Sequence, residues 1–249
     1  MHCVLLLLLF FVIGGGLKFL VLALMISHLF FLLVLSTSTL LFAFEECRFF
    51  LVRHGQSYPN VDGRIVSSLE NGVKSVNGLT DFGHTQARNA GQELYENLVV
   101  KSQVPKENIL VISSPFSRAK ETAEEIQSYL GCDIQIDSEL RERWFGSWDE
   151  KADDNYENVW AEDAKDSKHT EFGVESVEAV ARRTVKVLKA ANQNRHSDHQ
   201  IQALILVSHG DALQILQTSL LRKDLRTHRS LPHLNNCEVR EVFLQRDIQ

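Results

Sequence analysis

The chain has 249 residues, of which 44% are hydrophobic and 23% are charged, and its formal net charge at pH 7 is −6. A net negative chain without a basic stripe gives no support to nucleic-acid binding. Its cysteines are scattered and contain no CxxC pair, which disfavours both a disulfide framework and a zinc site. We expect reduced, individually placed thiols.

The N-terminal part of the chain is almost wholly apolar from residue 4 to residue 44, with Lys18 as its only formal charge. As a helix, residues 19–44 are long enough to cross a bilayer core of about 30 Å. We predict a membrane anchor within residues 1–45, with a cleaved leader or a misplaced start codon as the alternative. No Asn-x-Ser/Thr acceptor occurs, which favours a cytosol-facing domain, or a cytoplasmic protein if the leader is absent from the mature form.

The first apolar run after this leader, residues 49–52, is followed directly by Arg53, His54 and Gly55. A short continuous run of this kind predicts a buried strand, and ligands of open α/β sheets bind at the carboxyl ends of strands. Arginine offers a planar cation that suits phosphate oxygens, and histidine offers a nitrogen that attacks or shuttles a proton. The tripeptide therefore outlines a phosphate site, although so short a motif also arises by chance.

Helix and strand signals alternate along the rest of the chain. Residues 56–77 contain the turn signals VDGR and ENG and are predicted to form a polar loop. A helix then begins at the N-cap Thr80, and a later helix is opened by Pro115 and closed by Gly131. Strands are expected at residues 49–52, 109–112, 134–136, 203–208 and 239–244, and a further helix at residues 177–191.

This alternation, with short connections, predicts an α/β fold with a mostly parallel sheet and helices on both faces. Residues 46–249 are enough for one domain with a full core. Polar residues that follow three of the strands gather in such a sheet, because the carboxyl ends of parallel strands share one edge. Arg53, His54, Arg118 and His209 would therefore form a pocket for a tetrahedral anion, with helix N-termini adding backbone donors.

The segment 147–169 is acidic, with Trp148, Tyr156 and Trp160 interleaved. A run of charge is usually a solvated face, which is the interpretation we favour; the alternative is an insert over the site whose aromatic side chains help to select the ligand. Other polar residues are also expected at the surface, namely His84, His169, Arg222, Lys223, Arg226 and Arg229. For the four basic residues, contact with a multiply charged substrate is the alternative.

Five motifs in order give the chain a specific resemblance. They are RHG at 53–55 with Asn60 downstream, LTDFGHTQA at 79–87, SPFSRAKETA at 114–123, ERWFG at 142–146 and SHGD at 208–211. Over residues 49–243 the chain resembles the histidine phosphatase superfamily, in its phosphoglycerate mutase-like branch. The ordered set is far more specific than any one motif.

The resemblance implies a role for each matching residue. His54 would be the nucleophile that becomes phosphorylated, and Glu142 would give a proton to the leaving oxygen. The phosphoryl oxygens would be held by Arg53, Arg118, His209, Asn60 and the backbone at Gly210. The two arginines fit this assignment, because nearby cations lower the pKa of His54 and stabilise the charge on the transferred group. No metal or other cofactor is implied.

Two departures from the family pattern bear on function. Asp211 follows Gly210 where a small or neutral residue is common, so Asp211 is a second candidate acid unless it is turned away or paired. The arginine- and proline-rich insert that holds phosphoglycerates in cofactor-dependent mutases is not visible between Glu142 and Glu175. We therefore expect a phosphomonoester hydrolase acting on a small phosphorylated metabolite or a phosphoprotein. The alternatives are a mutase and a membrane-tethered, non-catalytic binder of phospho-ligands; the oligomeric state stays open.

Overall fold

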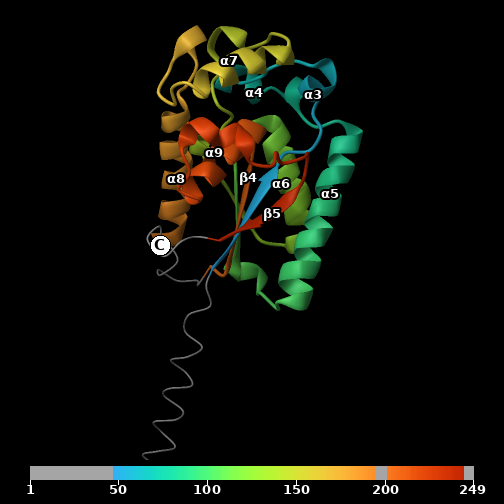
Figure 1. Cartoon of the computed structure of the whole chain (residues 1–249). Helices are drawn as coiled ribbons and strands as arrows, with labels where there is room; N and C mark the ends of the chain where they lie inside the picture. The colour runs from blue at the N-terminus through green and yellow to red at the C-terminus, as the bar shows by residue number, and fades with distance from the viewer. Residues whose placement is uncertain (1–46, 194–200, 244–249) are drawn as a thin grey trace, which may run out of the picture. The chain divides into compact units, whose positions relative to one another are not determined.

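The computed structural model describes residues 47–193 and 201–243 (Figure 1). The predicted anchor within residues 1–45 lies outside the described residues, as does Cys3. A search of the described ranges finds no helix that is both long enough and apolar enough to span a membrane. Cys132 and Cys237 are buried free thiols.

The core of the fold is a five-stranded sheet with the order β3-β2-β4-β1-β5. Its strands are β1 (Arg48–Arg53), β2 (Ile109–Ser113), β3 (Asp133–Ile136), β4 (Ala203–Ser208) and β5 (Val239–Val242). All neighbours pair in parallel except β5, which runs antiparallel to β1. The prediction of a mostly parallel sheet is confirmed. The register pairs Arg53 with Ser208, so that the RHG motif and His209 leave the sheet side by side.

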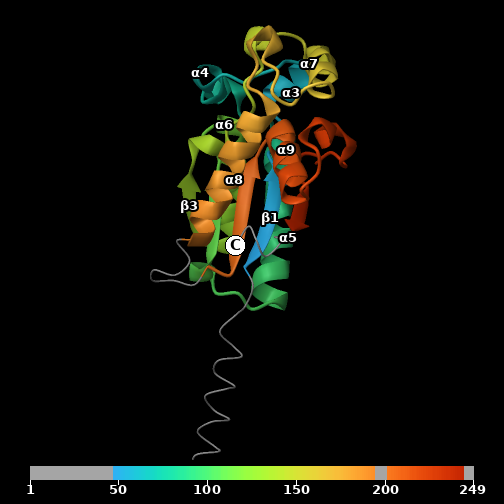
Figure 2. The same ribbon diagram turned by 60° about the vertical axis from the view of Figure 1, so that its left-hand side comes forward.

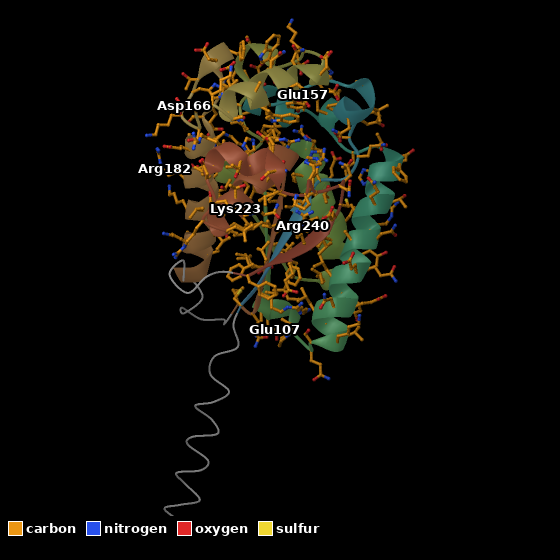
Figure 3. All side chains as sticks on the ribbon, in the orientation of Figure 1. Glu107, Glu157, Asp166, Arg182, Lys223 and Arg240 are labelled. Carbon is orange, nitrogen blue, oxygen red and sulfur yellow. The ribbon has the colours of Figure 1, made fainter. Side chains whose placement is uncertain are left out.

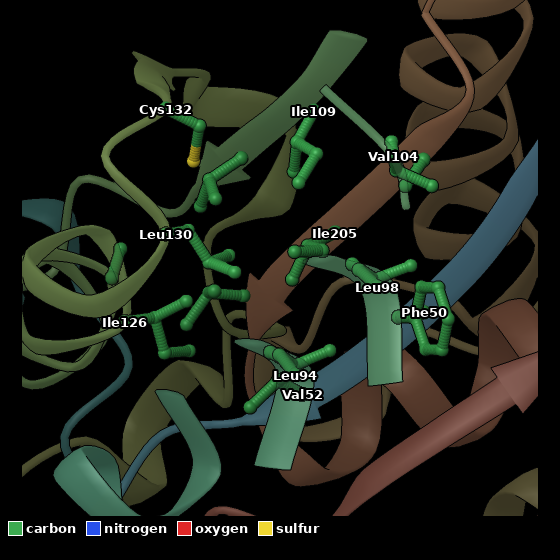
Figure 4. Packing of buried hydrophobic residues seen from close by; sticks show 14 of the residues in the cluster. Phe50, Val52, Leu94, Leu98, Val104, Ile109, Ile126, Leu130, Cys132 and Ile205 are labelled. Atoms are coloured by element: carbon green, nitrogen blue, oxygen red, sulfur yellow. The ribbon is translucent and has the colours of Figure 1, made fainter. Parts of the chain in front are cut away.

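Helices cover both faces of the sheet (Figures 1 and 2). One face packs on α5 (Asp81–Tyr95) and α6 (Ser117–Leu130), through strand residues such as Phe50 and Val52 (Figure 4). The other face packs on α8 (Val177–Gln193) and α9 (Gly210–Leu220), through residues such as Leu51. Parallel strands buried on both faces are largely apolar, which explains why β1, β2 and β4 are visible in the sequence as unbroken hydrophobic runs.

The helix ends follow the expected capping chemistry, with one correction. Thr80 caps α5, because its Oγ1 accepts a hydrogen bond of 3.0 Å from the Gly83 amide. Gly131 ends α6 in the left-handed conformation, with φ of 64°. The prediction that Pro115 opens α6 was wrong. The N-cap is Phe116, in extended conformation, and the helix begins at Ser117.

The predicted loop 56–77 is instead a series of short helices, α3 (Tyr58–Asp62), α4 (Leu69–Gly72) and η1 (Ser75–Asn77). Serine caps make this possible, since the Ser68 hydroxyl accepts from the Asn71 amide. Together with α7 (Tyr156–Asp163), these helices lie above the carboxyl ends of the strands (Figures 1 and 2). The remaining short elements are η2 (Glu96–Lys101), η3 (Lys106–Asn108), η4 (Ser138–Leu140), η5 (Gly146–Trp148), η6 (Asp153–Asn155), η7 (Glu171–Gly173) and η9 (Leu225–Ser230).

Candidate active site

A cavity of about 200 Å³ lies at the carboxyl ends of β1 and β4. Residues predicted from the sequence form much of its lining: Arg53, His54, Asn60, Arg118, Glu142, Gly210 and Asp211. The lining also contains Ser57, Arg64, Tyr156, Trp160, Arg229 and His233. For Tyr156, Trp160 and Arg229, contact with the substrate was only the alternative prediction, and for the other three none was made. The structure therefore brings residues from four of the five motifs to the lining of one cavity.

The RHG loop is packed so tightly on the start of α5 that only glycine fits at two positions. A Cβ on Gly55 would lie 2.6 Å from the Gly83 carbonyl oxygen, and one on Gly83 would lie 2.0 Å from that of Gln56. Gln56 donates its amide to Gln86 Oε1 at 2.8 Å, and Gly55 donates to Thr122 Oγ1 at 3.0 Å. The LTDFGHTQA and SPFSRAKETA motifs therefore hold the backbone that carries His54.

His54 is buried and its ring is held at both nitrogens. Nδ1 lies 2.8 Å from the carbonyl oxygen of Gly55, and Nε2 lies 3.1 Å from Nε of Arg118. A carbonyl only accepts and a guanidinium only donates, so the proton sits on Nδ1 and the lone pair on Nε2. Burial and then the charges of Arg118 and Arg53 hold the pKa of His54 well below its usual range. The imidazole is therefore neutral, with an unprotonated Nε2.

His209 lies next to His54, with 5.1 Å between the ring centroids, and is completely buried. Its Nε2 lies 2.8 Å from the hydroxyl of Ser114, whereas its buried Nδ1 has no hydrogen-bond partner among the described residues. Burial and the neighbouring Arg118 lower the pKa of His209 well below its usual range. His209 itself does not line the cavity; Gly210, the first residue of α9, does.

The two arginines carry charge that the protein leaves uncompensated. Arg53 donates from Nη1 to the Leu234 carbonyl (3.0 Å) and to His233 Nε2 (2.8 Å), and Arg118 donates from Nη2 to the Val66 carbonyl (2.9 Å). Arg53 Nε and Arg118 Nη1 are buried without partners, and neither guanidinium has a carboxylate within ion-pair distance in the described part of the chain. Burial lowers the pKa of both. Two such cations suit a dianion.

Glu142 is buried, and its Oε1 accepts from the backbone amides of Arg143 (2.8 Å) and Ala212 (3.4 Å). Glu142 forms no salt bridge with its sequence neighbours Arg141 and Arg143, because these arginines pair with Glu175 and Asp163. Burial and then the nearby Asp211 carboxylate raise the pKa of Glu142. The side chain is thus adapted to carry a proton.

Asp211 is held as a carboxylate. It accepts from Arg143 Nη1 (3.2 Å) and Trp160 Nε1 (3.1 Å), and His228 Nε2 and Arg229 Nη1 lie 3.5 and 3.8 Å away. Burial alone would raise the pKa of Asp211, but the contacts with His228, Arg143 and Arg229 outweigh it and the pKa is lowered. An anion so well paired is a poor proton donor, so the geometry favours Glu142 over Asp211 as the acid.

Several residues expected at the surface belong to this neighbourhood. Tyr156 and Trp160 of the acidic segment line the cavity, whereas Trp148 does not. Glu157 and Asp166 stand on the outer side of the segment (Figure 3). Arg229 packs over Trp160, with its guanidinium carbon 3.6 Å from the ring centroid. The other three members of the basic cluster, Arg222, Lys223 and Arg226, are exposed as expected.

The prediction for His169 was also wrong. Its side chain is 7% exposed and its Nε2 lies 2.6 Å from Asp163 Oδ1. Asp163 in turn binds the fully buried Arg143 through two hydrogen bonds of 2.6 and 2.7 Å. No local sequence signal distinguishes such a histidine from a solvated one. Its contact with Asp163, at the end of α7, is visible only in the folded structure. His84 is partly exposed and contacts Glu125.

An α/β sheet that presents a neutral histidine and two unpaired arginines at its carboxyl edge is the layout of an enzyme that handles phosphate esters. The chain belongs to the histidine phosphatase superfamily (branch 1), whose family model matches residues 49–247. The resemblance inferred from the motifs is confirmed.

Its relatives include both phosphatases and mutases. A protein of Photorhabdus laumondii named "Probable phosphoglycerate mutase" is 30% identical over 79% of this chain and 84% of its own. A glucosyl-3-phosphoglycerate phosphatase of Mycobacterium tuberculosis is 26% identical over 76% of this chain and 82% of its own. A solved structure of a mycobacterial glucosyl-3-phosphoglycerate phosphatase with VO3, 22% identical, covers 82% of this chain and 94% of that one with a TM-score of 0.66, which shows the shared fold.

Proposed function

We propose that the protein is a phosphomonoesterase that works through a phosphohistidine at His54. The observation that carries this proposal is the pairing, in one cavity, of an imidazole with an unprotonated Nε2 and a carboxyl group, Glu142, whose pKa is raised. The first supplies a nucleophile and the second a proton, which are the two groups that cleavage of an alkyl phosphate requires.

In the first step, His54 Nε2 forms a bond to phosphorus as the bond from phosphorus to the ester oxygen breaks. That oxygen takes the Glu142 proton and leaves as an alcohol. Arg53 and Arg118 line the cavity and supply the positive charge that stabilises the phosphoryl oxygens. Nδ1 of His54 keeps its proton and donates it in a hydrogen bond to the Gly55 carbonyl oxygen. This hydrogen bond holds the orientation of the phosphorylated ring.

In the second step, a water molecule attacks phosphorus, the bond to Nε2 breaks and inorganic phosphate is released. The Glu142 carboxylate takes a proton from the attacking water and is ready for another turnover. A mutase would instead transfer the phosphoryl group to a second hydroxyl of the substrate. Hydrolysis is favoured because the segment over the site contributes Tyr156 and Trp160 to the cavity, in place of an arginine-rich insert.

Product analysis tests the choice between these reactions. The purified protein is incubated with alkyl, sugar and hydroxy-acid phosphates, and the products are followed by phosphorus NMR. We expect free phosphate from the wild-type protein and from His84→Ala, a control histidine on α5 whose contacts are with Glu121 and Glu125, and none from His54→Ala. A rearranged ester without free phosphate would identify a mutase, and phosphate release by His54→Ala would refute the assigned nucleophile.

A further inference from the structure

Tyr156, Trp160 and Arg229 form a stacked wall along one side of the cavity, outside the motifs that define the family. The Tyr156 and Trp160 rings are parallel, with centroids 5.2 Å apart and an interplanar angle of 8°, and the Arg229 guanidinium covers the Trp160 ring. Phe145 meets Tyr156 edge to face, at 4.7 Å. Asp211 accepts the indole N–H, so the position of Trp160 is fixed. The wall is therefore a rigid part of the site.

The wall offers polar groups to a ligand, because the Tyr156 and Trp160 rings stack on each other and the Arg229 guanidinium covers the Trp160 ring. The Tyr156 hydroxyl has no hydrogen-bond partner among the described residues, and Tyr156 is only partly buried. Within the described residues, Arg229 Nη1 donates to Gln214 Oε1 and lies 3.8 Å from Asp211 Oδ1, and the other N–H groups of the guanidinium make no hydrogen bond. Burial raises the pKa of Tyr156, so its hydroxyl keeps its proton near neutral pH and can donate it.

The wall faces the part of a substrate that lies beyond the phosphoryl group. The residues proposed to contact the phosphoryl group lie at the end of β1 (Arg53), directly after it (His54) and in α6 (Arg118). Tyr156 and Trp160 come from α7. Glu142, the proposed proton donor to the leaving oxygen, is coupled to this second set. Its Oε1 accepts from the amide of Ala212, whose neighbour Asp211 holds Trp160. The acid and the wall are thus held together on the leaving-group side.

The charge around the wall is balanced. Arg143 and Arg229 are matched by the carboxylates of Asp163 and Asp211. Arg64, which also lines the cavity, donates to Glu150 at 2.9 and 3.0 Å. The uncompensated cations Arg53 and Arg118 are matched by the phosphoryl dianion. A leaving group with a further negative charge would therefore find no unpaired cation along the wall.

From this arrangement we infer that the wall is a leaving-group subsite that selects phosphate esters of small, uncharged, hydroxylated alcohols. The Tyr156 hydroxyl donates to a substrate oxygen close to the ester, and Arg229 offers a second donor. The cavity of about 200 Å³ has room for a phosphoryl group and a small alcohol beside it. The inference rests on the proposed phosphatase function, and it adds the substrate class and a specificity-determining role for Tyr156.

A matched pair of esters tests the subsite. Glycerol 3-phosphate and n-propyl phosphate differ in the hydroxyls near the ester, so their kcat/KM ratio isolates the hydrogen bonds to those hydroxyls. We expect wild type to prefer glycerol 3-phosphate, and Tyr156→Phe to reduce that preference by about 3- to 10-fold, the effect of one hydrogen bond. Inhibition by inorganic phosphate should stay within about 2-fold, because the phosphoryl site is intact. Tyr129→Phe, on the outer surface of α6, is the control.

Three results would overturn the inference: no preference in wild type, a preference unchanged in Tyr156→Phe, or a 10-fold preference for 3-phosphoglycerate over glycerol 3-phosphate. Calorimetry of both esters on His54→Ala, with and without Tyr156→Phe, gives the same ratio from binding alone. If wild type hydrolyses nothing but the binding preference depends on Tyr156, the subsite stands and the phosphatase proposal falls. If it hydrolyses both esters equally, the phosphatase proposal stands and the subsite falls.

Discussion

Replacing Glu142 by glutamine removes a proton donor with little other change to the site. The Glu142 Oε1 that accepts from the Arg143 and Ala212 amides has a counterpart in the glutamine carbonyl oxygen, so both hydrogen bonds can persist. Glu142 also has no ion pair to lose within the described residues. The expected cost is that of general acid catalysis, about 10²- to 10⁴-fold in kcat/KM for an alkyl phosphate.

The assay compares that alkyl phosphate with p-nitrophenyl phosphate, whose leaving group departs without much proton donation. Glu142→Gln should spare the aryl ester by comparison. Asp211→Asn should change both esters alike, because Asp211 is a paired carboxylate. It should also move the alkaline limb of the pH profile to lower pH, since removing the Asp211 charge lowers the pKa of Glu142. A selective loss on the alkyl ester in Asp211→Asn, and not in Glu142→Gln, would reverse the two roles.

Three further predictions concern pH, packing and the leader. Burial and the adjacent arginines lower the pKa of His54, so the acid limb of kcat/KM should lie well below pH 6.5; a limb at or above 6.5 would mean that His54 is not the titrating nucleophile. Gly83→Ala should lower the free energy of unfolding by about 1–3 kcal/mol in urea titrations, because its Cβ would lie 2.0 Å from the Gln56 oxygen; an unchanged midpoint would contradict this packing. We propose that residues 19–44 anchor the chain. The full-length protein should then stay in membranes through carbonate washing, and a version starting at Glu45 should be soluble and active. Release of the full-length protein by carbonate, or an inactive truncated form, would count against the anchor.

The sheet and the reactive residues could be predicted because their signals are local. The strands β1 and β4, which lead into the site, contain unbroken apolar runs buried on both faces, and the residues that immediately follow parallel strands share one edge of the sheet. The position of a polar side chain just after a strand is therefore fixed by topology alone. For this reason the sequence alone predicts that Arg53, His54 and Arg118 lie together.

The wall of the cavity could not be predicted in the same way. Arg229 lies in a basic cluster and Trp160 in an acidic segment, and composition predicts solvent exposure for both. Their inward positions depend on a shared partner, Asp211, which is 51 residues from Trp160 in sequence. The short helices of residues 56–77 were missed for a different reason, since a four- or five-residue helix with polar caps has the composition of a loop.

The most direct test of the central claim is the covalent intermediate. The protein is mixed with a ³²P-labelled ester and quenched rapidly, and the label on the protein is then exposed to acid and to alkali. The account predicts label that is stable to alkali, lost in acid and absent from His54→Ala, with His84→Ala labelled like the wild-type protein. Label that survives acid and is lost in alkali, or that persists in His54→Ala, would contradict it.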